Sequence, residues 1–229
     1  MARIKFGMMM TDARGKLGGH VFTKAKSGAT IRTKVTPLNP KTSAQSEARS
    51  ALGANSQAWR MLTETQRLAW NSAAQEVSKT NAFGDTYFPS GKNYFTAVNN
   101  NIRNVGGGVL VEPPALVTMP GLTSVEVDLD LVAEQLDIAP NLIGDDAGIV
   151  LVCNATSGQS SGRYNFSGKY RKFNAYSAAG LPQNTKIYDD YVSKFGVPSA
   201  GQKVSFEFYL VNPDTGQVSP RVTATVLLG

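Results

Sequence analysis

The sequence predicts a mixed α+β protein, in which an N-terminal extended arm with short strands precedes a three-helix module and a C-terminal antiparallel β-sandwich. Glycines interrupt residues 1–41, so no helical period is sustained there. Residues 42–108 place apolar side chains at helical spacing behind capping residues. Residues 109–229 hold short apolar runs separated by turn signals. These three ranges are the expected boundaries of the arm, the helical module and the sandwich.

The arm contains two short runs with strand character. Residues 21–23 form the first, and residues 29–35 alternate apolar with basic side chains, which is typical of a half-buried strand. Pro37 and Pro40 then favour an extended chain. Ordering such a segment costs about 1–2 kcal/mol per residue in backbone entropy. We therefore expect its strands to complete a sheet, either in its own chain or on a neighbouring subunit.

Two capping boxes predict a helical hairpin. Thr42 with Gln45 opens the first helix, and Thr63 with Gln66 opens the second. Since the turn between them is tight, the two helices lie side by side. The expected inner face of the first helix consists of residues at helical spacing: Ala44, Ala48, Leu52, Asn55 and Trp59.

Trp59 and Trp70 flank the turn of this hairpin, so their indoles can pack near each other. The simplest interpretation is that they form the hairpin's core, because apolar rings at helical spacing are usually buried. Arg60 and Arg67 are free to face outward or to stack on the rings.

A third helix is expected to begin after Ser90. Its apolar residues Tyr94, Val98 and Ile102 fall on one face. Three successive glycines at 106–108 cannot continue a helix and therefore end it.

The C-terminal half reads as strands of five to eight residues between turns rich in Pro, Gly, Asn and Asp. This spacing is typical of an antiparallel β-sandwich of immunoglobulin or fibronectin type. Residues 188–192 fit either a strand or a helical turn. The expected strands are residues 124–131, 135–138, 148–154, 203–212 and 221–228.

Charge is distributed unevenly along the chain. Residues 1–104 carry 15 Lys and Arg against 5 Asp and Glu, whereas residues 105–229 carry 8 against 12. A basic segment can face nucleic acid or an acidic protein surface. The opposite signs also favour head-to-tail contact between copies of the chain.

The residues needed for catalysis or metal binding are scarce. One His and one Cys cannot form a structural zinc site, and His20 and Cys153 are far apart in the sequence. Cys153 fits a buried strand residue. The acidic pairs at 145–146 and 189–190 lack calcium-loop spacing and are expected in solvated turns. We therefore expect no enzyme activity, no catalytic residues, no metal and no other cofactor.

The basic start of the chain is followed by only a short apolar run, which excludes a signal peptide, and no run is long enough for a membrane span. The lone Cys153 permits no internal disulfide, in keeping with synthesis in a reducing cytoplasm.

Four motifs carry a family resemblance. They are Gly-Gly-His-Val-Phe at 18–22, Gly-Ala-Thr-Ile-Arg at 28–32, Pro-Leu-Asn-Pro-Lys-Thr at 37–42 with Gln45, and Trp-Arg-Met-Leu-Thr-Glu-Thr-Gln-Arg-Leu-Ala-Trp at 59–70. Together they resemble a family of uncharacterised tailed-bacteriophage proteins with prophage-related bacterial relatives. The resemblance implies a virion component made in the host cytoplasm, and it brings no catalytic residues.

We thus expect a non-enzymatic virion structural protein of the neck or tail apparatus. It would assemble with other virion proteins and with copies of itself, without a membrane or a small-molecule substrate. The candidate assembly residues lie in the arm and the helical hairpin: Arg14, Lys16, Lys24, Lys26, Arg32, Lys34, Trp59, Arg60, Arg67 and Trp70.

Three alternatives stay open. The chain could be a capsid decoration protein, or a basic packaging protein whose arm contacts DNA. It could also bind glycans through exposed aromatic side chains on one sandwich face, namely Tyr164, Tyr170 and Tyr176.

Overall fold

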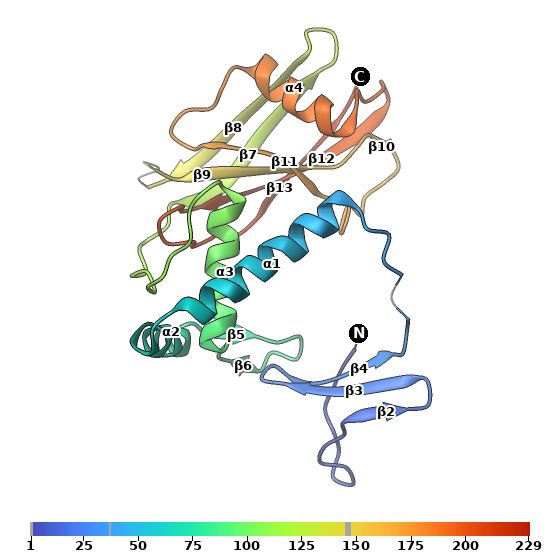
Figure 1. The fold of residues 1–229 in the computed structure, drawn as a ribbon. Coiled ribbons are helices and arrows are strands. Elements are labelled where there is room, and N and C mark those ends of the chain that lie inside the picture. Colours follow the sequence, from blue (N-terminus) through green and yellow to red (C-terminus); the bar gives the residue numbers. More distant parts are fainter. Residues whose placement is uncertain (1, 37, 145–147) are drawn as a thin grey trace. The chain divides into compact units, whose positions relative to one another are not determined.

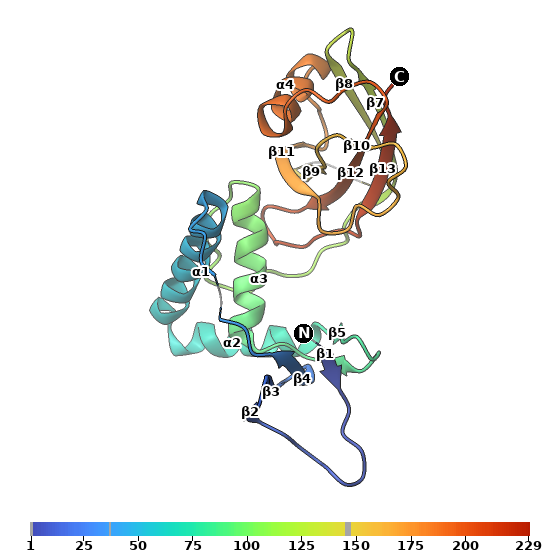
Figure 2. The same cartoon turned by 90° about the vertical axis from the view of Figure 1, so that its right-hand side faces the viewer.

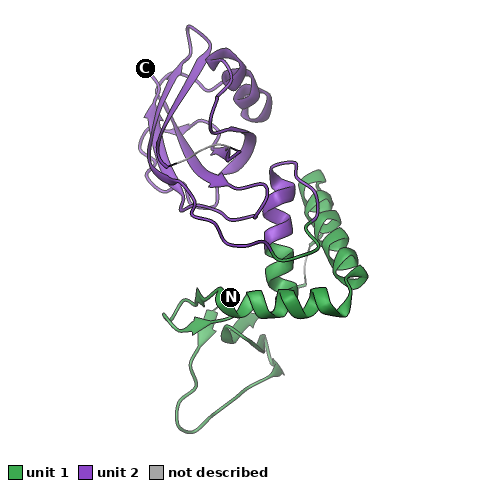
Figure 3. Ribbon diagram, turned by 90° about the vertical axis from the view of Figure 1, so that its left-hand side faces the viewer, with its two compact units in different colours: residues 1–97, 110–113 green, residues 98–109, 114–229 purple. Residues whose placement is uncertain are grey.

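The structure is a computed structural model that describes residues 2–36, 38–144 and 148–229. Within these residues the chain is a mixed α+β protein with four helices and antiparallel strands in several sheets (Figure 1). It divides into two compact units (Figure 3). Unit 1 comprises residues 1–97 and 110–113, and unit 2 comprises residues 98–109 and 114–229.

Unit 1 begins with a four-stranded antiparallel sheet in the order β1-β4-β3-β2. Its strands are β1 (Ala2–Ile4), β2 (Gly15–Leu17), β3 (His20–Ala25) and β4 (Gly28–Thr33). The strands expected in the arm thus complete a sheet within their own chain, which is one of the two arrangements expected, and the arm is not simply extended. We call this sheet the N-terminal sheet.

Two helices follow the N-terminal sheet, α1 (Ser43–Met61) and α2 (Glu64–Glu76). The capping box of α2 is confirmed, since Thr63 and Gln66 bond reciprocally. At α1 only half of the expected box forms. The Thr42 side chain accepts from the Gln45 backbone, but within the described residues Oε1 of Gln45 has no hydrogen-bond partner.

A short hairpin of β5 (Lys79–Thr80) and β6 (Thr86–Tyr87) leads into α3 (Gly91–Asn104). The expected apolar face of α3 is confirmed: Tyr94, Val98 and Ile102 are all buried. The helix ends where the glycines begin, and the Gly107 N–H bonds to the Ile102 carbonyl. The division between the units falls inside this helix, after Ala97.

Unit 2 contains a two-stranded hairpin and a five-stranded sheet, and all their pairings are antiparallel. The hairpin consists of β7 (Gly121–Asp130) and β8 (Gln135–Ile143). In the larger sheet β12 is central and pairs with β9, β10 and β13, while β11 pairs with β9. These strands are β9 (Val150–Ala155), β10 (Gln159–Ser160), β11 (Arg171–Ser177), β12 (Gln202–Val211) and β13 (Val222–Leu227).

Both sheets of unit 2 contribute to one hydrophobic core. The strands follow one another around it, and α4 (Asn184–Phe195) lies against β8 and β11 (Figure 2). Residues 188–192 are thus helical. The core includes Leu129 and Leu136 from the hairpin, Phe206 and Phe208 from the larger sheet, and Tyr191 from α4.

Candidate assembly surface

The strand register gives the N-terminal sheet two chemically different faces. Side chains alternate between faces along a strand, and directly paired residues share a face. Phe22 pairs with Ile31, so both lie on one side. Thr23 pairs with Thr30 on the other side, where their hydroxyl oxygens are 2.7 Å apart.

One side, which we call the apolar face, gathers most of the sheet's hydrophobic side chains. Pairings of β1 and β2 with the central strands add Ile4 and Leu17 to the Phe22–Ile31 pair. The polar residues His20, Lys24 and Thr33 share this side. The apolar face thus consists mainly of Ala2, Ile4, Leu17, Phe22, Ala29 and Ile31.

The other side, which we call the cationic face, places basic side chains on three of the four strands. Lys16 of β2 pairs with Val21, which in turn pairs with Arg32 of β4. Arg3 of β1 lies in the neighbouring row, opposite Thr30. The Arg3 guanidinium donates to the Ser27 carbonyl in the turn between β3 and β4.

Neither face is fully buried: Ile4, Phe22 and Ile31 of the apolar face are half-buried. From Ala2 to Thr36 no residue is buried, and Leu17 retains 71% of its exposure. The segment between β1 and β2 adds Met8 and Met9, which are fully exposed. Flexible, polarisable methionines are common on protein-binding surfaces. Burial of apolar surface contributes roughly 25 cal/mol per Å², so a partner that covers the surface still exposed on the apolar face stabilises it.

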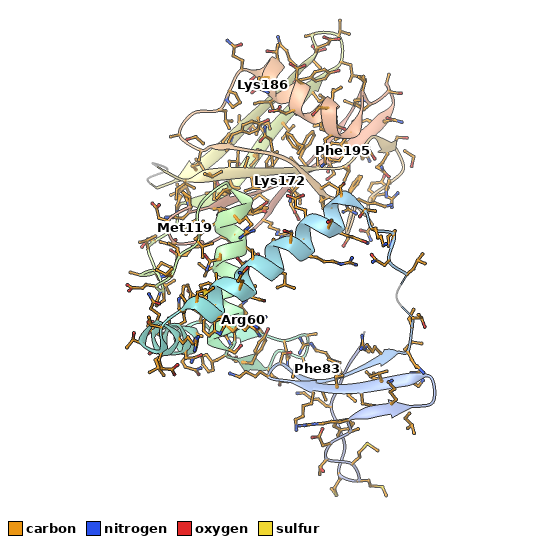
Figure 4. All side chains as sticks on the ribbon, viewed as in Figure 1. Arg60, Phe83, Met119, Lys172, Lys186 and Phe195 are labelled. Carbon is orange, nitrogen blue, oxygen red and sulfur yellow. The ribbon has the colours of Figure 1, made fainter. Side chains whose placement is uncertain are left out.

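Few contacts tie the N-terminal sheet to the rest of unit 1. Nζ of Lys5 lies 3.0 Å from Oδ1 of Asp85 and 5.5 Å from the centre of the Phe83 ring (Figure 4). Nδ2 of Asn81 donates to the Ser27 carbonyl (3.1 Å). Hydrogen bonds from Lys5 and Asn81 lower the pKa of the Asp85 carboxyl. Exposed ion pairs contribute little stability, so the sheet is held mainly through its own ladder.

The basic candidate residues of the arm do not form one patch. Lys24 and Arg14 both lie beside Oδ2 of Asp12, at 3.2 and 3.6 Å. The hydrogen bond from Lys24 holds the pKa of Asp12 below its usual value. Lys26 occupies the turn between β3 and β4, and Lys34 follows β4; both are exposed. Of these candidate residues, only Lys16 and Arg32 lie on the cationic face, which they share with Arg3.

The helical hairpin keeps its tryptophans for its own packing. The ring centre of Phe95 on α3 lies 5.4 Å from that of Trp59 and 5.2 Å from that of Trp70, so the indoles meet through Phe95. Trp70 is fully buried, and its Nε1 donates to the Val111 carbonyl (2.9 Å). Its assignment as an assembly residue is therefore wrong, because no partner can reach it. Trp59 is half-buried.

The arginines beside the tryptophans stay near the helix surface. Nη2 of Arg67 donates to the Arg60 carbonyl (2.8 Å), which fastens α2 to the end of α1, and Nη1 lies 3.5 Å from Glu64. The side chain of Arg60 is exposed (Figure 4). Arg60 is therefore accessible to a partner, whereas Arg67 already serves the hairpin.

The expected inner face of α1 is only partly buried. Asn55 is fully buried, but Ala44, Ala48 and Leu52 are exposed, with Leu52 retaining 54% of its exposure. The first turns of α1 thus add apolar surface to unit 1, together with Met61 at its end.

A surface of opposite charge to the cationic face, which we call the acidic face, lies on the β7–β8 hairpin of unit 2. Val125 and Leu129 of β7 point into the core, so the residues that alternate with them, Glu126, Asp128 and Asp130, point outward. Asp128 lies directly opposite Asp137, and like charges in this arrangement are destabilising. The acidic face consists of Glu126, Asp128, Asp130 and Asp137, all exposed. The alternation of acidic and apolar residues in 124–131 was a signal for this face, but only the pairing reveals it.

The remaining candidate residues have structural surroundings. Cys153 is a buried residue of β9, as expected, and burial raises the pKa of its thiol. Among the described residues no group of three or more His, Cys, Asp and Glu side chains could hold a metal ion. None of the described helices is both long and apolar enough to pass through a bilayer.

The two acidic pairs have different outcomes. Residues 145–146 lie outside the described residues. Asp190 is not in a solvated turn but on α4, where Nδ2 of Asn174, the Tyr176 hydroxyl and Nζ of Lys186 donate to it at 2.6, 2.7 and 2.9 Å. Burial opposes ionisation of Asp190, but these hydrogen bonds prevail and lower the pKa of its carboxyl. Asp190 thus fastens α4 to β11.

The three candidate glycan-binding tyrosines do not share a surface. Tyr176 is buried against Asp190, and Tyr164 is 87% exposed, with Nζ of Lys203 lying 4.6 Å from its ring centre. Tyr170 is half-buried, and its hydroxyl lies 2.9 Å from that of Ser205. A flat platform of these three rings is therefore wrong.

Comparison of the chain with protein-family models, with curated proteins and with solved structures gave no match.

Proposed function

We propose that this chain is a non-enzymatic structural subunit of a bacteriophage virion that assembles through its N-terminal sheet. One observation carries the assembly part of the proposal: within the described residues the four-stranded sheet keeps Lys16 and Arg32 exposed on one face and a half-buried to exposed apolar surface on the other. The motifs at 18–22, 28–32, 37–42 and 59–70, which resemble tailed-phage proteins, support the virion part.

The charges of the two units favour another copy of the chain as one partner. Packing two N-terminal sheets through their cationic faces would oppose Lys16 and Arg32 to their own copies, which is unfavourable. The acidic face of the β7–β8 hairpin offers complementary charge and carries the like-charge pair Asp128–Asp137. A cation between these carboxylates would relieve their repulsion.

This pairing joins two different surfaces, so it is a heterologous contact. Such contacts close into rings or extend into filaments. A ring suits a neck or tail component, which is the place we propose, with other virion proteins covering the apolar face and the exposed methionines. A capsid decoration protein is the alternative.

The two sheets of unit 2 share one core, which supports a β-sandwich related to the immunoglobulin or fibronectin type. We propose that this sandwich faces outward from the particle or makes a second subunit contact.

A DNA-packaging role is the second candidate, favoured by the cationic face itself. Lys16, Arg32 and the nearby Lys26 and Lys34 could neutralise several phosphates, with a steep dependence on salt. DNA bound to the cationic face would not cover the apolar face on the other side of the sheet.

Sedimentation velocity of the full chain, with and without a DNA duplex, separates these candidates. We expect self-association without DNA that weakens as salt is raised, because the proposed contact joins exposed charges. A monomer at all salt concentrations, which sediments faster only when DNA is added, would instead support the packaging role and contradict assembly through the sheet.

A further inference from the structure

A polar hollow lies in unit 2, independent of the proposed assembly surface. It has a volume of about 490 Å³, within the range of small-ligand sites. Strands β9 and β12, the segment before β11 and the residue just before β13 contribute its lining, which consists of Asn154, Ser167, Gly168, Tyr170, Glu207 and Arg221.

The centre of the hollow is the carboxylate of Glu207. Its neighbours Phe206 and Phe208 on β12 point into the core, so Glu207 projects from the opposite side of the sheet. Only 8% of the residue is exposed. A carboxylate buried to this extent is costly unless it is hydrogen-bonded.

Two donors hold this carboxylate in place, and both use the same oxygen. Nδ2 of Asn154, directly opposite on β9, donates to Oε1 at 2.9 Å, and Nη1 of Arg221 donates to Oε1 at 3.0 Å. Oε2 is therefore the oxygen that can accept hydrogen bonds from a ligand in the hollow.

The other groups around the carboxylate are also fixed. The Arg221 guanidinium lies 5.2 Å from the ring centre of Tyr209, and the Tyr170 hydroxyl lies 2.9 Å from that of Ser205. Gly168 has a φ of +74°, which suits the tight turn that brings Ser167 to the rim. These contacts orient the lining side chains before any ligand arrives.

This combination of groups selects a class of ligand. Glu207 repels an anion, and Arg221 repels a cation, so the ion pair favours a neutral molecule. A carboxylate oxygen, a guanidinium, an amide and a hydroxyl offer both acceptors and donors to adjacent hydroxyl groups. The half-buried Tyr170 ring adds an apolar surface suited to a sugar's C–H groups. We propose that the hollow binds a single neutral sugar unit of a glycan.

The test uses the full chain and the methyl glycosides of glucose, galactose, mannose and N-acetylglucosamine. We expect at least one of them to bind and to shift the backbone NMR signals of Tyr170 and Arg221. Glu207→Gln should weaken that binding about tenfold or more, because it replaces a charged acceptor. Glu134→Gln, which removes an exposed carboxylate between β7 and β8 of the same unit, is the matched control and should leave binding unchanged.

Circular dichroism and melting of both variants check that the fold is retained. If Glu207→Gln fails to fold, the NMR shifts of the unaltered chain still show whether the sugar occupies the hollow, since a sugar bound there must perturb Tyr170 and Arg221. Binding of none of the four glycosides, or shifts confined to residues away from the hollow, would overturn the proposal.

Discussion

Deleting residues 2–36 is expected to abolish self-association of the chain while both remaining parts stay folded. The deletion removes the apolar and cationic faces together, which are the surfaces proposed to meet a partner. The sheet is joined to the β5–β6 hairpin through the exposed Lys5–Asp85 ion pair and a part-buried hydrogen bond from Asn81 to the Ser27 carbonyl. Its loss therefore leaves the packing around Trp70 and Phe95 in place.

Sedimentation velocity measures the expected change from an assembly to a monomer. Circular dichroism and thermal melting of the same sample serve as the control for folding. Assemblies of unchanged size after the deletion would show that the N-terminal sheet is not the contact surface.

Trp70→Ala is expected to lower the free energy of unfolding of the helical hairpin by about 3–5 kcal/mol, the usual cost of removing a large core side chain. Trp70 is fully buried, packs edge-on against Tyr94 and Phe95, and donates to the Val111 carbonyl. Trp59→Ala should cost clearly less, because Trp59 is only half-buried.

Urea unfolding followed by circular dichroism measures both losses. Leu68→Ala is the matched control on α2, since Leu68 is 58% exposed and its loss should change stability by no more than about 0.5 kcal/mol. Equal losses of unfolding free energy for the two variants would contradict the difference in burial and would indicate that both indoles contribute equally to the core.

Local chemistry explains what could be predicted from the sequence. The side chains of Thr42 and Thr63 cap their helices by accepting a hydrogen bond from the residue three positions further on, so the sequence alone indicates both helix starts. The start of α4 was not visible, because Gln183 makes no side-chain cap. The sequence of residues 188–192 is consequently compatible with either a strand or a helix.

The candidate surfaces depend on contacts between distant residues. Strand propensity indicated β3 and β4, but not that β1 would pair with β4 and thereby add Ile4 to the apolar face. Likewise, Asn154 and Arg221 meet Glu207 only through the pairing of β9 and β13 with β12. Register of this kind is set by tertiary packing, which a single sequence does not reveal.

Head-to-tail assembly through opposite charges can be tested with two charge-reversed chains. One carries Lys16→Glu and Arg32→Glu on the cationic face, and the other carries Asp128→Lys and Asp137→Lys on the acidic face. In each chain alone positions 16 and 32 carry the same sign of charge as positions 128 and 137, which removes the proposed attraction. In the mixture every contact is again between opposite charges. Lys169→Glu with Lys194→Glu, two exposed cations elsewhere, is the matched control and should assemble normally.

Sedimentation velocity at low salt measures the size of the species formed by each chain and by their mixture. We expect monomers for each reversed chain and assemblies of normal size for their equimolar mixture. Assembly of either reversed chain alone, or a mixture that stays monomeric while both chains are folded, would contradict head-to-tail assembly through opposite charges.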